Sequence, residues 1–431
     1  MTKKLLSVLV SMTMILTLLA GCGNAGTPET ESQQTPEEVT AEEPTTEETA
    51  PETEESAAAE ESADVGELTN EEIKIQKVNA AETKGKEPVL DINEIYGLSP
   101  EGDLATLAGD LQLTEEDTAK IKDGNFKVAI CMHMLNNDVN VTKTNLIKDT
   151  LESYGVNVIA VTDGESNVDT MISNLETVMA MEPDLIISIA YDVNAMVPIF
   201  EQVRDAGIKL VFFECAPAGF ESGTDYAALV STDYYGNGRF AAEYMAYLLN
   251  YEGKVGIAYY DADVWTCNQR DQAFRDVMAK YPDIEVVADQ GYADYNQAGV
   301  VADAILAQYP DLDGMYATWD VPAEDCITSA EAVGRDDLII TTVDLGENSA
   351  RILAQGGMIK GIGSPRSYQD GTAISMAALY ALIDKDLGSG YIATPTMGCT
   401  QENVLDAYKV IFNTEPAAEI VNVWNENNGA E

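Results

Sequence analysis

Short runs of apolar residues alternate with longer amphipathic segments from residue 126 onward. The apolar runs predict buried strands, over residues 127–132, 156–161, 184–189, 209–213, 227–231, 254–259, 285–288, 314–317, 338–343 and 359–363. Apolar positions three or four residues apart predict helices, over residues 142–154, 171–181, 197–206, 238–249, 269–281, 297–308, 323–333, 348–355 and 369–383. Such alternation is typical of an α/β fold whose parallel sheets carry helices on both faces. Two successive halves of about 300 residues together fit two domains better than one.

The segment before this alternation, residues 65–123, is polar and mixed. Thr114 precedes three consecutive acidic residues, and this pattern predicts a capped helix start. We interpret residues 65–123 as an N-terminal arm that packs on the main domain or leads into it.

The first 22 residues have the pattern of an export signal. Lys3 and Lys4 precede an apolar run over residues 5–19, and small residues then lead to Cys22. This ending is similar to a bacterial lipobox, so we expect Cys22 to be acylated, with an ordinary cleaved signal as the alternative. Residues 23–64 have no Lys, Arg or aromatic residue, and their acids predict an extended tether, with an acidic interaction tail as the other interpretation.

Charge and residue counts exclude several classes of partner and chemistry. The formal net charge of −50 argues against nucleic acid and against lying on an anionic membrane surface. Besides Cys22, five widely spaced cysteines remain and His133 is the only histidine, so we expect buried free thiols, with one buried disulfide as the alternative, and neither a metal site nor a cofactor. Gly236, Gly238 and Ala241 imitate a dinucleotide fingerprint, but no acidic residue follows at the required place. We instead expect these glycines to let the chain turn between two lobes.

Candidate binding residues follow the predicted strands, because ligands bind parallel sheets beyond the carboxyl ends of their strands. They are His133, Asn137, Asp138, Asp192, Glu214, Trp265, Arg270, Tyr295, Trp319, Asp320, Asp344 and Arg366. Aromatic faces beside carboxylates suit a polyhydroxylated ligand, whose C–H face packs on a ring while its hydroxyls donate to carboxylates.

The order of these motifs carries a resemblance to a known family. The matching pieces are Asn136-Asn137, Asp192, the KLVFFE strand, VSTDYYGNG at residues 230–238, residues 270–274, Trp319-Asp320 and Val343-Asp344. From Phe126 to about Val423 the chain resembles the ribose-binding-protein family of type 1 periplasmic sugar-binding proteins, which feed ABC importers. The resemblance implies two lobes joined by three crossings, the first over residues 124–232 and 366–396, the second over residues 233–365 and 397–425. It also implies a ligand-binding role for Arg270, an acceptor role for Asp344 and hydroxyl contacts for Asn137.

The departures from the family pattern alter the expected ligand. Asp138 stands where the family has aromatic residues, Glu214-Cys215 replaces an Asp-Arg pair, and Trp319-Asp320 replaces an Asn-Asp pair. A glutamine of the second crossing is replaced near Ser364-Pro365. We therefore expect a monosaccharide other than ribose, or a sugar alcohol, stacked on Trp265, Trp319 or Tyr295.

Plainer roles stay open for several of these residues. Asp192 and Asp344 suit helix caps, Arg270 suits a surface helix start, and Trp319 suits a core or an interface between lobes. The expected protein is a monomeric, lipid-anchored binding protein on the outer face of a Gram-positive cytoplasmic membrane, working with an ABC importer permease. It is not expected to be an enzyme. A receptor that presents its ligand to a membrane sensor kinase or chemoreceptor is the alternative function.

Overall fold

The computed structural model describes Pro88 and residues 94–429, apart from residues 136–137 and 263. The chain divides into units of residues 1–64 and 65–431, and the first unit, with the predicted signal, Cys22 and the tether, lies outside the described residues. In the described part, no helix is both long enough and apolar enough to span a bilayer.

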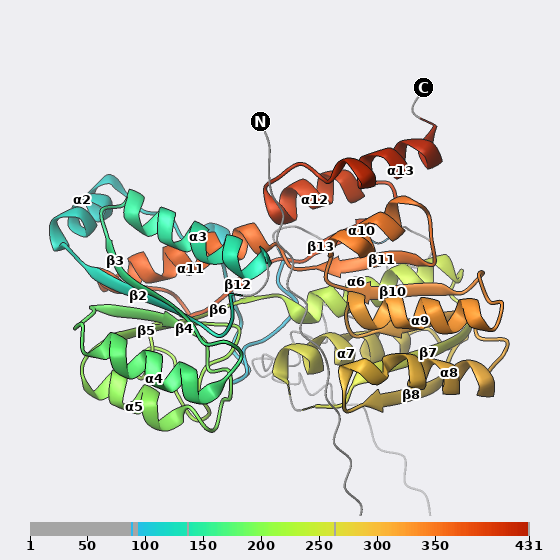
Figure 1. Ribbon diagram of the computed structural model, residues 1–431, viewed down its shortest axis with the longest axis horizontal. Coiled ribbons are helices and arrows are strands. Elements are labelled where there is room, and N and C mark those ends of the chain that lie inside the picture. Colours follow the sequence, from blue (N-terminus) through green and yellow to red (C-terminus); the bar gives the residue numbers. More distant parts are fainter. Residues whose placement is uncertain (1–87, 89–93, 136–137, 263, 430–431) are drawn as a thin grey trace, which may run out of the picture. The chain divides into compact units, whose positions relative to one another are not determined.

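The first lobe is built on a seven-stranded sheet in which every pairing is parallel. In sheet order the strands are β1 (Thr106–Leu107), β12 (Tyr391–Thr394), β6 (Ala228–Thr232), β5 (Lys209–Phe213), β4 (Leu185–Ser188), β2 (Lys127–Met132) and β3 (Asn157–Asp163). One face is covered by α3 (Asp138–Ser153) and α11 (Ser367–Leu382), and the other by α4 (Val168–Met179) and α5 (Val197–Asp205) (Figure 1). The inner strands β2, β4, β5, β6 and β12 are buried along almost their whole length, as apolar strands between two helical layers should be, whereas the edge strands β1 and β3 are only partly buried.

The second lobe repeats this plan on a six-stranded sheet. Its strands, in sheet order, are β13 (Met397–Thr400), β11 (Ile359–Ser364), β10 (Ile339–Val343), β9 (Gly314–Ala317), β7 (Gly253–Tyr260) and β8 (Ile284–Tyr292). Its helices are α6 (Tyr234–Leu248), α7 (Trp265–Met278), α8 (Ala298–Gln308), α9 (Asp320–Ala332), α10 (Glu347–Ala354), α12 (Val404–Phe412) and α13 (Ala418–Asn428). Only β13 runs antiparallel to its neighbour, β11.

In each sheet the strands that follow in the chain are added first on one side and then on the other side of a single strand, which is β2 in the first lobe and β7 in the second. β2 lies between β3 and β4, and β7 lies between β8 and β9. Loops at such a point diverge to opposite sides of the strand, which leaves a crevice at its carboxyl end. The residues after β2 and β7 are therefore well placed to face a ligand.

The chain passes between the two sheets three times. The crossings lie between β6 and α6, between β11 and α11, and between β12 and β13. Asp233, in the first crossing, is fully buried, and its carboxylate accepts hydrogen bonds from the backbone N–H groups of Tyr96 (2.7 Å), Gly97 (2.8 Å) and Gly236 (2.8 Å). Its own N–H donates to the carbonyl of Thr394 at 2.9 Å, beside the third crossing.

The N-terminal arm packs on the first lobe. Its helix α2 (Glu115–Gly124) begins after Thr114, whose hydroxyl accepts from the N–H of Asp117, which confirms the predicted cap. The short turn η2 (Ala108–Asp110) follows β1, and Lys385 of the first lobe pairs with Asp117 at 2.6 Å. The arm therefore adds an edge strand and an ion pair to the lobe.

The expected turning role of Gly236 and Gly238 is wrong. Both residues lie inside α6, and neither has a positive φ. A Cβ at Gly238 would collide with the carbonyl of Arg270 in α7, and one at Gly236 would collide with the carboxylate of Asp233. These glycines lie within α6 and permit its close packing, against α7 at Gly238 and against the carboxylate of Asp233 at Gly236.

Several predicted boundaries differ from the structure, and one strand and one helix show this clearly. The strand predicted over residues 285–288 is longer in the structure, where β8 spans Ile284–Tyr292. It is an edge strand with several exposed positions, so a continuous apolar run covers only part of its length. Residues 265–268, expected in a loop, form the first turn of α7, so Trp265 projects from a helix.

Replacing Asp233 by Ala should leave three backbone donors unpaired and lower the free energy of unfolding by about 3 kcal/mol or more. The exposed cap Asp294, which accepts from Asn296 at 3.0 Å, provides the control, and its change to Ala should cost about 1 kcal/mol or less. Urea unfolding of both variants measures the difference. Equal losses would show that Asp233 acts only as a helix cap.

Candidate ligand-binding cleft

His133 follows β2 and packs on the aromatic ring of Tyr191, which follows β4. The two rings are stacked, with centroids 5.5 Å apart and planes at 18°. Burial, stronger than the opposing charge of Glu214, lowers the pKa of His133 and favours the neutral imidazole. Its Nδ1 is buried and has no hydrogen-bond partner among the described residues.

Glu214 follows β5 and forms an ion pair with Lys143 of α3. The Nζ of Lys143 lies 3.0 Å from a carboxylate oxygen of Glu214, and the lysine side chain is 8% exposed. Burial alone would lower the pKa of Lys143, but Glu214 and Asp370 raise it above the ordinary value. Conversely, Lys143 and His133 outweigh burial and hold the pKa of Glu214 below its usual range. The first lobe thus presents a charged, largely desolvated pair.

Lys143 was not among the predicted site residues. A lysine within an amphipathic helix usually faces solvent, so its helical position gave no signal. Glu214 adopts a left-handed backbone conformation, with φ of 61°. This turn of the backbone at the strand end carries the carboxylate to Lys143.

A cavity of 550 Å³ opens beside this pair. It is lined by Pro100, Glu101, Ala190, Tyr191, Asp192, Val193, Asn194, Glu214, Cys215, Ala216, Pro217, Ala218, Gly219, Val264 and Trp265. Three of the predicted site residues therefore line the same cavity, namely Asp192, Glu214 and Trp265. Pro100 and Glu101 belong to the N-terminal arm, and the sequence held no sign that the arm reaches the cleft.

Asp192 combines a structural role with its place on the cavity wall. One of its carboxylate oxygens accepts from the N–H groups of Asn194 (3.0 Å) and Ala195 (2.8 Å). These bonds close a turn that precedes helix α5, whose N-cap is Met196, so Asp192 does not cap that helix as the sequence had allowed. The side chain remains exposed, so its other oxygen can accept from a hydroxyl.

Arg270, in α7 of the second lobe, is buried and bound to the ends of two strands. Its guanidinium donates to Asp344 after β10 (3.0 Å) and to the carbonyl of Thr318 after β9 (3.2 Å). It also lies over the ring of Tyr234, 5.1 Å from the ring centre. Burial would lower the pKa of Arg270, but Asp344 raises it, so the group stays charged. Arg270 is therefore not a surface residue at a helix start.

Asp344 and Asp320 place two carboxylates close together in the second lobe. Asp344 has φ of 68°, and its side chain is 37% exposed while it accepts from Arg270. Burial, then the charges of Asp344 and Glu324, raise the pKa of Asp320 to about 7. Asp320 therefore changes charge near neutral pH.

The two tryptophans of the predicted site lie in different surroundings. Trp319 precedes α9 and meets Tyr260 and Tyr292 edge to face, at 5.6 and 6.3 Å, so it also belongs to an aromatic cluster of the second lobe. Trp265 meets Tyr234 at 6.3 Å and Tyr391 of the first-lobe sheet at 6.4 Å. Trp265 thus joins the second-lobe helix α7 to the first lobe beside the cavity.

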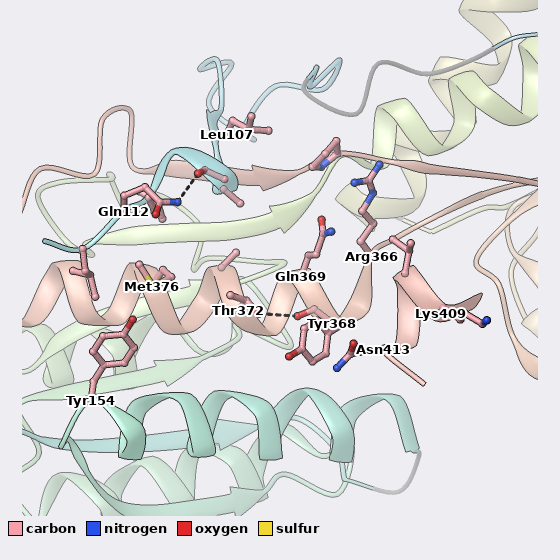
Figure 2. A pocket seen from close by; sticks show the side chains of 17 residues that line it. Leu107, Gln112, Tyr154, Arg366, Tyr368, Gln369, Thr372, Met376, Lys409 and Asn413 are labelled. Atoms are coloured by element: carbon pink, nitrogen blue, oxygen red, sulfur yellow. Dashed lines mark hydrogen bonds between the residues drawn. The ribbon is translucent and has the colours of Figure 1, made fainter. Parts of the chain in front are cut away.

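The remaining predicted residues fall into two groups. Asn137 lies outside the described residues, and the side chains of Asp138, at the start of α3, and Tyr295, in the turn η3 (Tyr295–Gln297), are not described either. Arg366 lines a second cavity, which shares no lining residue with the first (Figure 2). We therefore remove Arg366 from the proposed cleft.

The five described cysteines are unpaired, and one of them lines the cavity. Cys131, Cys215, Cys267, Cys326 and Cys399 are free thiols. Cys215 is half-buried and lines the cavity, whereas the other four are buried. Among the described residues no group of three His, Cys, Asp or Glu side chains is placed to hold a metal ion.

The fold and the facing polar groups define a two-lobed α/β binding protein, and comparisons identify the family. The model of a periplasmic binding protein domain matches residues 128–386, more than half of the chain. A D-ribose/D-allose-binding protein of Pseudomonas aeruginosa is 24% identical over 214 residues, which cover 48% of this chain and 67% of the relative. The chain belongs to the periplasmic binding protein family, and the predicted ribose-binding-like type 1 fold is confirmed.

Solved structures agree with this fold. An ABC transporter solute-binding protein of Agrobacterium vitis with bound α-D-tagatopyranose has a TM-score of 0.58 and 22% identity, covering 66% of this chain and 99% of that one. A solute-binding protein of Bacillus halodurans with bound myo-inositol has a TM-score of 0.56 and 21% identity, covering 66% and 98%. At these identities the likeness concerns the fold.

Replacing Glu214 by Gln should lower the free energy of unfolding by about 3 kcal/mol at neutral pH, because Lys143 loses its carboxylate while buried. Burial then depresses the pKa of Lys143 in the folded state, so the unfolded state binds more protons. The stability of this variant should therefore rise between about pH 7 and about pH 9. The wild-type pair gives no such rise, since its lysine pKa is already raised.

Urea unfolding across this pH range measures both effects. The double variant with Lys143→Met, which removes the orphaned charge, should recover most of the lost stability. A Glu214→Gln variant as stable as wild type, with the same pH dependence, would show that the pair is not coupled as described.

Proposed function

We propose that this chain is the solute-binding protein of an ABC importer and captures a monosaccharide or sugar alcohol between its lobes. The observation that carries this proposal is the pairing of charged groups on both lobes, Lys143 with Glu214 and Arg270 with Asp344. Each pair leaves carboxylate oxygens that can accept from hydroxyls, while its cation can donate to hydroxyl or ring oxygens. The relatives that bind tagatose and myo-inositol support this ligand class.

The proposed site comprises His133, Asn137, Asp138, Asp192, Glu214, Trp265, Arg270, Tyr295, Trp319, Asp320 and Asp344, with Lys143 and Glu101 added from the structure. A sugar presents an apolar C–H face, which the rings of Tyr191 and Trp265 on the cavity wall suit. Binding that uses both lobes would favour their closed arrangement, because only then do both sets of side chains reach one ligand. We also propose export, acylation at Cys22 and a tether over residues 23–64, which would hold this domain outside the cell beside a permease.

The test is calorimetric titration of the purified protein with pentoses, hexoses, hexitols and inositols, beside nucleosides and amino acids. The proposal requires saturable binding of at least one carbohydrate or polyol. Binding of a nucleoside or an amino acid alone would refute the ligand class while leaving the two-lobed fold intact. The absence of binding across the carbohydrate and polyol series would refute the proposed function.

Replacing Arg270 by Met should weaken carbohydrate binding about tenfold or more, because charge-assisted hydrogen bonds to the ligand are lost. Arg275, on the same helix, pairs with Asp289 at 2.7 Å outside the cleft, so Arg275→Met is the matched control and should bind as wild type does. Dissociation constants of the two variants from the same titrations decide the matter. Unchanged affinity after Arg270→Met would place the ligand elsewhere.

A further inference from the structure

A cavity of 840 Å³ lies against α11, apart from the cleft (Figure 2). Segments distant in sequence form it, namely the arm around η2, Tyr154 just after α3, helix α11 with the preceding Arg366, the third crossing at Pro395, and helix α12 with the following Asn413. Its lining residues are Leu107, Ala108, Gly109, Leu111, Gln112, Leu113, Tyr154, Arg366, Tyr368, Gln369, Thr372, Ala373, Met376, Pro395, Lys409, Val410 and Asn413. The proposed capture of a sugar makes no use of this space.

Arg366 is a buried cation on the wall of this cavity. The residue is 6% exposed, and one guanidinium nitrogen donates to the carbonyl of Thr396 at 3.0 Å. Its Nε has no hydrogen-bond partner, and within the described ranges Arg366 forms no ion pair with a carboxylate. A buried guanidinium without a counter-ion is costly, so this position favours an anion supplied from outside.

The nearby acid Asp370 forms no direct ion pair with Arg366 among the described residues, although its charge acts on the guanidinium. Its two carboxylate oxygens accept from the hydroxyls of Thr232, at 3.0 Å, and Thr394. Burial lowers the pKa of Arg366 despite the charge of Asp370, in keeping with an incompletely compensated cation. The Nε–H of the guanidinium is buried and is left without an acceptor among the described residues.

The other residues that line the cavity indicate which chemical groups such an anion would have besides its charge. Leu107, Leu111, Leu113, Met376 and Val410 supply apolar surface, and the rings of Tyr154 and Tyr368 lie at one side of the cavity (Figure 2). Lys409 also lines the cavity but pairs with Glu415 at 3.0 Å, so its charge is already balanced. A single unbalanced cation beside apolar and aromatic walls matches one anionic group on a flat apolar body.

We propose that this cavity is a second ligand site, which binds a small organic anion with an apolar, aromatic body through the guanidinium of Arg366. Arg366 lies in the second crossing and Pro395 in the third, so a bound anion contacts two of the three segments that join the lobes. The site is independent of the cleft and of any carbohydrate.

Calorimetric titration with 2-naphthoate at neutral pH tests the proposal, with neutral 2-naphthamide and inorganic phosphate as companion probes. Naphthoate should bind with a dissociation constant in the millimolar range or below. The amide, which lacks the charge, and phosphate, which lacks the apolar body, should each bind about tenfold more weakly or worse. Equal binding of the amide, or no binding of naphthoate, would overturn the proposal.

Two variants test the residue assignment. Arg366→Met should weaken naphthoate binding about tenfold or more, whereas Lys409→Met, on the same cavity, should change it less than about twofold. Val410→Trp fills the cavity from a partly exposed position while keeping Arg366, and it should also abolish binding. Naphthoate affinity that survives both Arg366→Met and Val410→Trp would overturn the assignment. Because no carbohydrate is present, either outcome leaves the proposed sugar binding untouched.

Discussion

The buried carboxylate of Asp233 is the constraint on which the arrangement of the lobes depends. It occupies the first crossing and binds the arm at Tyr96 and Gly97, while its backbone and that of Thr394 connect two crossings. A buried carboxylate is tolerated only when several donors surround it, and these donors come from segments far apart in the sequence. The arm is thereby fixed where the two lobes meet, and the ring of Tyr96 also packs on the guanidinium of Arg239, with 4.1 Å between Arg239 Cζ and the ring centre.

That fixed point positions the cleft. Residues 98–104 follow directly from the anchored Gly97 and bring Pro100 and Glu101 to the cavity that Glu214 and Trp265 also line. Two contacts position Arg270, namely the close packing of α6 on α7 at Gly238 and the hydrogen bond from its guanidinium to Asp344. Charged groups that are already oriented and partly desolvated lose little entropy on binding, which favours selective contacts with hydroxyls.

The sequence predicts most of the strands and helices because buried parallel strands are continuous apolar runs. It does not predict β1, β12 or β13, whose few residues pair with partners far away in the chain and carry no local pattern. The residues of the proposed site likewise divide into those that the sequence predicts and those that it does not. Glu214 and Asp344 follow strands and were expected, as was Arg270, which the sequence placed at the start of a helix and the structure places in the second turn of α7. Lys143 lies within a helix and Glu101 within the arm, and neither was expected. Arg366 was expected in the cleft but lines the other cavity, because its position at a crossing does not determine which cavity its side chain reaches.

The most direct test of the account is a crystal structure of the protein with the carbohydrate or polyol that binds it most tightly. The account predicts one ligand bound between the lobes, with hydroxyls within hydrogen-bond distance of Glu214 or Asp192 on the first lobe and of Arg270 or Asp344 on the second. A ligand that contacts a single lobe, or that lies outside this cleft, would contradict the account.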